Sequence, residues 1–378
     1  MRVGIDGREL RGSRTGVGRY LIELLARWTR DAEASRHTLV LFTPEAIDTA
    51  PWNGSGGATL AVNPVPGGGG TAWEQVALRR AARRHALDVF FAPGYTAPLA
   101  LGLPVVVAVH DVSFAAHPEW FRWREGLRRR LVTRAATRQA TTVLALTEFG
   151  RREIETHLGV PSKKVRVISP GADPHPCFAA PHLSRTPAAG MHEPLILFAG
   201  SIFNRRNVPL LLRGFARLAA RHPEVRLEIV GENRTHPHED IGALIEAANQ
   251  GARVTLRRYV PEETLAGLYS RARAFAFLSS YEGFALTPLE ALRAGVPPVL
   301  LDTPVAREVY DEAALFVADH DEAGLAAALE RLLTDERLRL RLVEAGGRLL
   351  DRYSWDRTAR ETLAALLDAA HPSSTGSP

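Results

Sequence analysis

Two glutamates eight positions apart, Glu282 and Glu290, are the pair with the clearest chemical potential in the sequence. Thr287, Pro288 and Glu290 fit a helix start with a capping box, so Glu290 has a structural explanation. Glu282 has none, because it lies beyond the expected strand Ala274–Leu278. Its carboxylate can accept sugar hydroxyls while the backbone N–H groups that follow face the same ligand. Those N–H groups belong to Gly283, Phe284, Ala285 and Leu286.

A second polar group follows another expected strand, Leu195–Gly200. Arg205 and Arg206 place two guanidiniums beside the start of a helix, where rigid forks of donors and the helix dipole can neutralise a diphosphate. Gly200, Ser201 and Asn207 complete this candidate ligand-binding segment. Arginine is abundant in the chain, so a solvated arginine face, with Asn207 as a helix N-cap, is the alternative.

The first half of the chain has two further candidates. His110 and Asp111 follow a strongly apolar run, and ligands bind outside the carboxyl ends of strands in open α/β sheets. Gly16 and Gly18 open an expected helix whose N–H groups can approach a phosphate. Leu21 replaces the third glycine of the dinucleotide fingerprint. A buried loop histidine and a plain helix start are the structural alternatives.

Short apolar runs alternate with helical patterns along the chain, which is typical of parallel sheets built from βα units. The first series of expected strands is Arg2–Asp6, Thr38–Thr43, Asp88–Ala92, Pro104–His110, Thr142–Thr147 and Lys164–Ser169. The second series is Leu195–Gly200, Val225–Gly231, Arg253–Arg257, Ala274–Leu278 and Pro298–Leu301. The sequence therefore predicts an α/β protein with two doubly wound domains of similar size.

The domain boundaries follow from composition. We expect Rossmann-like domains at residues 1–178 and 195–353, joined by a linker at 179–194 that is rich in Pro, Ala, His and Ser. We expect a final helix at 354–371 to pack back on the first domain, followed by a disordered tail at 372–378. The glycine-rich segment Gly56–Gly70 is expected to be a mobile surface loop.

Composition excludes several classes of protein. The formal charge is +5, yet the only lysines are Lys163 and Lys164, which suit neither a Walker loop nor a pyridoxal Schiff base. No nucleic-acid-reading motif accompanies the charge. The single cysteine, Cys177, has no internal disulfide partner, and the first residues lack a signal-peptide pattern, so we expect a cytoplasmic protein.

Arginines and aromatic residues are concentrated in the segment Arg122–Arg138, which Trp120, Phe121 and Trp123 precede or begin. Such a basic helix can sit on anionic lipid headgroups. The alternative is a solvated arginine face.

Taken in order, these segments resemble the retaining glycosyltransferases of family 4, which have the GT-B fold of two facing Rossmann-like domains with mainly parallel sheets. The resemblance covers nearly the whole chain. It rests on His110–Phe114, Gly200–Asn207 and Glu282–Glu290, with support from Trp73–Gln75 and Tyr353–Trp355.

The resemblance implies a role for each candidate residue. The donor is a nucleoside-diphosphate sugar, GDP-mannose by analogy, with its diphosphate on Arg205 and Arg206. Glu282 holds the sugar hydroxyls, Glu290 the ribose, and His110 contacts the sugar. Gly16 and Gly18 lie near the phosphates, and Asp111 belongs to the donor-binding set.

The same resemblance implies a reaction without a metal or another cofactor, because cations and N–H dipoles stabilise the departing diphosphate. The acceptor is a glycan or a polyprenyl-linked lipid used in building cell-surface polysaccharide. Peripheral contact with the inner face of the membrane, through the Arg122–Arg138 helix, fits that role. Nucleic acid is not an expected partner.

Some residues depart from the family pattern. Arg206 stands where lysine is usual, Ala285 replaces a common glycine and Thr287 a common proline. The segment Ser169–Asp173 also differs from the usual Pro-Asn-Gly-Val-Asp, which puts the loop contacts near the domain junction in question. Arg206 preserves the charge while changing its geometry.

Two other functions fit the same motifs. One is a nucleotide-sugar epimerase of GT-B shape, and the other is a noncatalytic nucleotide-sugar-binding partner. Acceptor-dependent release of a nucleoside diphosphate distinguishes a transferase from both.

Overall fold

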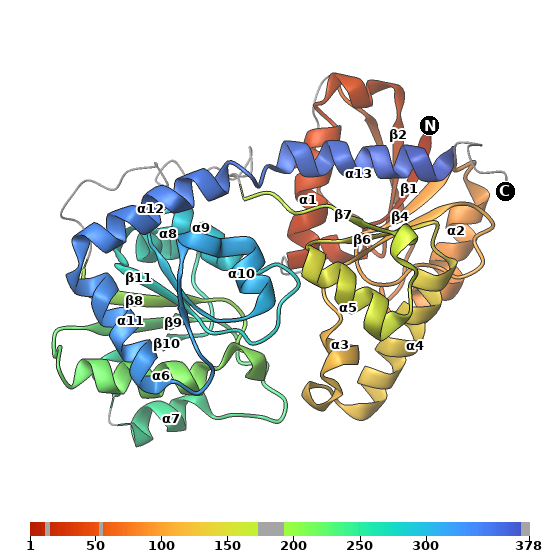
Figure 1. Cartoon of the computed structure of the whole chain (residues 1–378). Helices are drawn as coiled ribbons and strands as arrows, with labels where there is room; N and C mark the ends of the chain where they lie inside the picture. The colour runs from red at the N-terminus through yellow and green to blue at the C-terminus, as the bar shows by residue number, and fades with distance from the viewer. Residues whose placement is uncertain (12–15, 53–55, 173–192, 249, 372–378) are drawn as a thin grey trace. The chain divides into compact units, whose positions relative to one another are not determined.

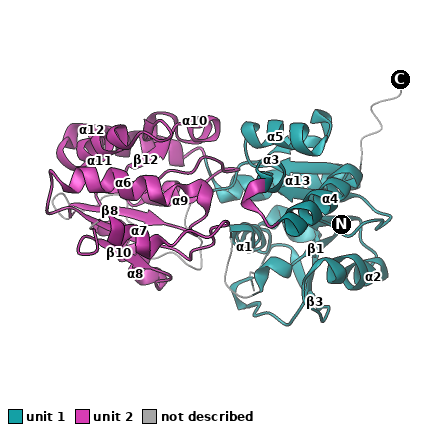
Figure 2. Ribbon diagram, turned by 90° about the horizontal axis from the view of Figure 1, so that it is seen from below, with its two compact units in different colours: residues 1–118, 123–177, 353–378 teal, residues 119–122, 178–352 magenta. Residues whose placement is uncertain are grey.

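The computed structural model describes residues 1–378 except 12–15, 53–55, 173–192, 249 and 372–378. It contains two compact units, which Figure 2 colours separately. Unit 1 comprises Met1–Pro118, Trp123–Cys177 and Tyr353–Pro378, and unit 2 comprises Glu119–Arg122 and Phe178–Arg352. The expected linker at 179–194 lies outside the described residues as far as 192, and the expected tail at 372–378 lies outside them entirely.

The described part of unit 1 contains a sheet of seven parallel strands in the order β3-β2-β1-β4-β5-β6-β7. The strands are β1 Arg2–Asp6, β2 Thr38–Thr43, β3 Thr59–Pro64, β4 Val89–Ala92, β5 Val105–Val109, β6 Thr142–Ala145 and β7 Val165–Val167. All five residues of β5 are buried, as its unbroken apolar sequence requires in a sheet covered on both faces. The predicted α/β fold with parallel sheets is confirmed.

One expectation is wrong. The segment Gly56–Gly70 is not a loop throughout, because β3 pairs in parallel with β2, with Thr59 opposite Thr38 and Pro64 opposite Thr43. The strand lies at the sheet edge and is only partly buried. An edge strand needs no continuous apolar run, so its signal is hidden between the flanking glycines.

The helices of unit 1 are α1 Gly16–Trp28, α2 Arg79–Arg84, α3 Ser113–Ala116, α4 Trp123–Gln139, α5 Glu148–Leu158 and α13 Trp355–Ala370. Helix α5 shows why these segments begin and end where they do. Thr147 accepts the N–H of Gly150 through its hydroxyl, and Gly159 ends the helix in the left-handed conformation.

The last helix, α13, packs on α1 in unit 1, and Figure 1 shows the two helices in blue and red. The indole N–H of Trp28 donates to the Ala359 carbonyl at 2.9 Å. The Arg27 guanidinium joins Glu23 of its own helix to Asp356 of α13. These contacts place the end of the chain against its beginning.

The described part of unit 2 contains six parallel strands in the order β10-β9-β8-β11-β12-β13. They are β8 Leu195–Ala199, β9 Arg226–Val230, β10 Val254–Arg257, β11 Ala274–Phe277, β12 Pro298–Leu301 and β13 Leu315–Val317. Strand β13, a short edge strand, has no counterpart among the expected strands. The strand order reverses between β8 and β11, and ligands bind at the carboxyl side of such a reversal.

The helices of unit 2 are α6 Val208–Ala219, α7 Ile241–Ala247, α8 Glu262–Arg271, α9 Thr287–Arg293, α10 Pro304–Tyr310, α11 Glu322–Thr334 and α12 Glu336–Leu350. None of the helices in the described ranges is long and apolar enough to cross a membrane.

Gly171 lies in close contact with the start of α13. A Cβ at this position would lie 2.1 Å from the backbone nitrogen of Trp355. Because neither backbone can move aside freely, we expect Gly171→Ala to destabilise the protein by about 1–3 kcal/mol.

Gly347 of α12 is the matched control, since nothing lies within 4 Å of a Cβ built there. We expect Gly347→Ala to stabilise the protein by about 0.5–1 kcal/mol through helix propensity. Urea unfolding of the two variants measures both effects. Equal stabilities would contradict the close fit at Trp355.

Candidate functional site

The turn after β8 positions Arg206. Gly200 has φ +133°, and a Cβ there would lie 2.4 Å from Nη1 of Arg206, so both the backbone and the space require glycine. The same Nη1 donates to the Ser201 carbonyl at 2.8 Å. The Arg206 side chain is therefore folded back over its own turn, toward the loop after β11.

Glu282, in the loop after β11, accepts a hydrogen bond from Arg206. Its Oε1 accepts Arg206 Nε at 3.2 Å and the Ser279 hydroxyl at 2.9 Å, and Arg205 Nε lies 3.8 Å away. No hydrogen bond from any described residue reaches Oε2. One oxygen of the carboxylate thus orients the arginines, while the other makes no hydrogen bond within the described residues.

Aromatic rings hold the two guanidiniums. The Cζ atom of Arg205 lies 4.6 Å from the ring centroid of Phe203, and that of Arg206 lies 4.9 Å from the ring centroid of Phe277. Both arginine side chains are only 12–13% exposed. The two guanidiniums thus lie side by side in a partly desolvated turn, an arrangement that suits a polyanion such as a diphosphate.

Asn207 connects the two loops. It has a left-handed backbone with φ +47° just before α6, and its amide nitrogen donates to the Leu278 carbonyl at 3.2 Å. It makes no side-chain capping bond to α6. Asn207 thus occupies the N-cap position that the sequence offered as an alternative, but its side chain joins the loop after β8 to the loop after β11.

The capping-box interpretation of Glu290 is wrong. Helix α9 has Leu286 in the N-cap position with helical geometry and no side-chain capping bond. Glu290 Oε2 instead accepts the Tyr269 hydroxyl at 3.4 Å. The carboxylate thus has a partner on α8.

Ala285 occupies a strained position in the turn Glu282–Leu286. Its φ is +70°, in the left-handed region that costs a residue with a Cβ about 1–2 kcal/mol. The Tyr310 hydroxyl of α10 donates to its carbonyl and fixes the peptide. A glycine would adopt this backbone without strain, which explains physically why glycine is common at the matching family position.

A mainly apolar pocket opens beside Glu282. Its lining includes Phe277, Ser279, Phe284, Ala285, Thr303 and Tyr310. Gly283 and Leu286 belong to the same turn. The expected donor-binding residues of unit 2 thus converge at the carboxyl ends of β8 and β11, with Glu290 one helical turn into α9.

His110 follows β5 in unit 1. Its Nε2 lies 2.7 Å from the Pro93 carbonyl, and because a carbonyl only accepts, the proton is on Nε2. The Tyr20 ring packs edge-on at 5.1 Å between centroids. Burial lowers the pKa of the imidazole, with the Pro93 carbonyl and Asp111 opposing that shift. The ring is therefore neutral at pH 7, and Nδ1 is a hydrogen-bond acceptor.

Asp111 orients the neighbouring loop. Its Oδ1 accepts the backbone N–H of Ser113 at 2.9 Å and the Ser113 hydroxyl at 2.6 Å, while Oδ2 accepts the Tyr95 hydroxyl at 3.3 Å. Gly16 begins α1 with open space around its Cα, and Gly18 is buried one half-turn later. These residues lie at the carboxyl side of the sheet in unit 1.

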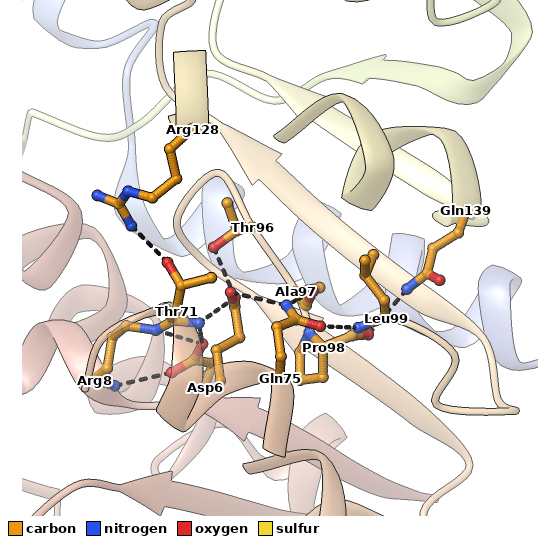
Figure 3. A network of polar contacts seen from close by, with 11 residues as sticks. Asp6, Arg8, Thr71, Gln75, Thr96, Ala97, Pro98, Leu99, Arg128 and Gln139 are labelled. Carbon is orange, nitrogen blue, oxygen red and sulfur yellow. Dashed lines mark hydrogen bonds and ion pairs between the residues drawn. The ribbon is translucent and has the colours of Figure 1, made fainter. Parts of the chain in front are cut away.

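A buried ionic network at the same sheet edge was not among the predicted site residues. The Arg8 guanidinium pairs with Asp6 at the end of β1 (Figure 3). It also pairs with Glu74, which accepts the Thr96 hydroxyl at 2.7 Å. Burial disfavours charge on Arg8, but the two carboxylates outweigh it and raise its pKa above the usual value. The network ties together the segments after β1 and β4.

The sequence held only part of the signal for this network. Asp6 ends an expected strand and Glu74 lies in the Trp73–Gln75 motif, but Arg8, which pairs with both, is 66 residues from Glu74 in the sequence. Within the described ranges, no three His, Cys, Asp or Glu side chains gather as a metal-binding group.

Family models match both halves of the chain. Residues 183–348 match "Glycosyl transferases group 1", and residues 14–175 match "Glycosyltransferase Family 4". Between them the two matches cover most of the sequence.

Relatives and solved structures agree with this. The mannosylfructose-phosphate synthase of Agrobacterium fabrum is 27% identical over 258 residues, which cover 65% of this chain but only 56% of the relative. The O-antigen chain mannosyltransferase B of Escherichia coli is 25% identical, covering 69% of each chain. The chain thus aligns with little more than half of the Agrobacterium protein.

Two solved structures share the fold. The sucrose-phosphate synthase of Thermosynechococcus elongatus has a TM-score of 0.74 at 18% identity, covering 98% of this chain and all of the other. The Anabaena protein HepE, in complex with UDP-glucose, has a TM-score of 0.71 at 16% identity, covering 97% of this chain and all of the other.

The arginine turn predicts a measurable anion affinity. We expect Arg206→Gln to weaken binding of inorganic pyrophosphate about tenfold or more, because a charge-assisted hydrogen bond is lost. Isothermal titration calorimetry measures the affinity. The control is Arg213→Gln on α6, where the arginine is exposed and pairs with Glu322. Equal affinities for the two variants would refute the assignment.

The neutral His110 predicts a pH effect on stability. Since its pKa is lowered in the folded chain, the unfolded chain binds a proton first as the pH falls through about 6.5. We expect the stability of the native protein, relative to His110→Asn, to be greatest above pH 6.5 and to decrease toward pH 5. Unfolding free energies measured across that range test this, and a difference independent of pH would contradict it.

Proposed function

Because the two halves of the chain match these models, it belongs to the group 1 glycosyltransferases, and we propose that it is a retaining hexosyltransferase using a nucleoside-diphosphate sugar. The observation that carries the proposal is the pair Arg205 and Arg206, held by Glu282 and two aromatic rings beside the start of α6. Such an array binds a diphosphate before the reaction begins.

In the proposed reaction, the bond between the anomeric carbon and the diphosphate oxygen breaks, and negative charge develops on that oxygen. Guanidiniums already oriented by Glu282 stabilise this charge with little reorganisation. They supply the positive charge that a divalent cation would otherwise bring, so we propose a transfer that needs no metal and no other cofactor.

Retention follows if the acceptor attacks the face that the diphosphate leaves. The acceptor oxygen forms the new bond to the anomeric carbon, and its proton passes to the departing phosphate oxygen. No protein base is needed for that step. In this proposal Glu282 Oε2 accepts a donor-sugar hydroxyl, His110 Nδ1 accepts another, and Glu290 holds the ribose.

We propose a mannosyl donor, GDP-mannose, and a glycan or polyprenyl-linked acceptor for cell-surface polysaccharide. The two curated relatives named above, one a mannosyltransferase and one a mannosylfructose-phosphate synthase, support the sugar class. In this proposal the enzyme is cytoplasmic and meets its acceptor at the inner face of the membrane.

The first experiment identifies the donor. It measures the melting temperature of the chain with GDP, UDP, dTDP, ADP and their sugar conjugates, in the absence of added metal. A ligand that binds only the folded chain raises its melting temperature by mass action. We expect GDP and GDP-mannose to give the largest shift. A larger shift with another nucleotide would replace the mannosyl assignment. If no ligand in the panel raised the melting temperature, the assignment as a nucleotide-sugar-dependent enzyme would be refuted.

Glu282→Gln is the decisive variant. We expect acceptor-dependent release of nucleoside diphosphate to fall about a hundredfold or more, because the amide neither orients the arginines nor accepts the sugar hydroxyl as the carboxylate does. Glu263→Gln on α8 is the control, since its side chain is exposed. Addition of EDTA should leave the rate unchanged.

The outcomes separate the competing functions. Release of nucleoside diphosphate without any acceptor would indicate an epimerase or hydrolase, and binding without release would indicate a noncatalytic partner. A Glu282→Gln enzyme with the native rate would remove Glu282 from the mechanism.

A further inference from the structure

The outer face of α4 exposes three large apolar side chains in one stripe. Trp123 is 71% exposed, Leu127 48% and Leu131 61%. Their spacing of four residues places them one above the other on the same side of the helix. A soluble surface rarely gathers such residues without a use for them.

The buried face of α4 makes this stripe more unusual. The residues that α4 buries are all small: Gly126, Thr133, Ala136 and Thr137. In α1 the pattern is the ordinary one, because Leu24, Leu25 and Trp28 point into the core. Packing within unit 1 therefore does not explain why α4 has its largest apolar groups on the outside.

Positive charge surrounds the stripe. The helix carries six arginines, all exposed: Arg124, Arg128, Arg129, Arg130, Arg134 and Arg138. Its one acidic residue, Glu125, pairs with Arg129 at 2.7 Å. The Arg124 guanidinium lies 5.1 Å from the ring centroid of Trp123, so charge and apolar surface are interleaved.

We propose that this face of α4 docks on an anionic lipid bilayer. The tryptophan and leucines enter the boundary between headgroups and acyl chains, while the arginines bind lipid phosphates. Uncharged apolar surface alone fits many partners, but the exposed Trp123 and Leu131, flanked by Arg124, Arg130 and Arg134, complement a surface that is anionic outside and apolar beneath.

The docking face also adjoins the polar network of unit 1. Arg128 Nη1 donates to the Thr71 hydroxyl at 2.5 Å (Figure 3). Thr71 lies two residues before the helical turn Trp73–Leu78, which carries Glu74. A bilayer bound to α4 thus lies beside the carboxyl edge of this sheet. That the bilayer carries the acceptor rests on the proposed function. The docking of α4 on lipid does not depend on it.

Co-sedimentation with vesicles tests the docking on the full chain. We expect binding to phosphatidylglycerol–phosphatidylcholine vesicles, weakening as salt is raised, and little binding to phosphatidylcholine alone. We expect the double variant Leu127→Gln, Leu131→Gln to lose about tenfold or more in vesicle affinity. We expect the same loss for the double variant Arg130→Gln, Arg134→Gln.

Helix α12 provides matched controls. Leu340 is 54% exposed, and Arg337 and Arg341 are exposed on the same helix. We expect Leu340→Gln and the pair Arg337→Gln, Arg341→Gln to bind vesicles as the native chain does. Loss of binding in these variants as well would mean a general charge or hydrophobic effect and would overturn the proposal.

Tryptophan emission gives an independent readout. Trp123 is exposed, whereas Trp28, Trp52, Trp73 and Trp355 are buried. We expect anionic vesicles to shift the emission to shorter wavelength and the shift to be lost in Trp123→Phe. An unchanged shift in that variant would place the contact elsewhere.

The remaining outcomes are distinct. Equal binding to neutral vesicles, or none to either kind, would overturn the proposal, as would a dimer in light scattering that depends on Leu127 and Leu131. We expect the leucine variants to keep the native rate with a water-soluble acceptor and to lose rate with a vesicle-borne one. Glu282→Gln should still bind vesicles, so failure of the docking and failure of the transferase assignment are told apart.

Discussion

The pairing of Arg206 with Glu282 is the interaction on which the site in unit 2 depends. It joins the loop after β8 to the loop after β11, and it sets Arg206 between a carboxylate and aromatic rings. A buried ion pair is costly unless further hydrogen bonds support it, and here the Ser279 hydroxyl donates to Glu282 Oε1 and the Ser201 carbonyl accepts from Arg206 Nη1. Gly200 makes the arrangement possible, because any Cβ at that position would occupy the space of the guanidinium.

At the sheet edge of unit 1 a charged side chain is again held by groups of opposite charge, but with the signs exchanged. There one arginine, Arg8, is held by two carboxylates, whereas in unit 2 two arginines share Glu282. The first network sets two carboxylates around one guanidinium, and the second sets two guanidiniums around one carboxylate.

The ends of the chain are joined by packing more than by charge. Trp355 is fully buried in the core of unit 1, against the backbone of Gly171, and the Trp28 indole donates to the Ala359 carbonyl of α13. Because α13 supplies part of this core, residues near position 360 stabilise the fold of residues near position 20. The large apolar residues of α4 are exposed and do not pack in this core. This contrast indicates that they have a function at the surface.

The sequence by itself determined the class of fold and the loops that hold the candidate residues, because unbroken apolar runs such as β5 and turn residues such as those around Gly200 act locally. The tertiary structure alone decided what depends on distant partners. It paired Thr59–Pro64 as an edge strand, turned Glu290 from a helix cap toward Tyr269, and joined Glu74 to Arg8. Local patterns record periodicity and turn preference, whereas these contacts depend on which segments the fold brings together.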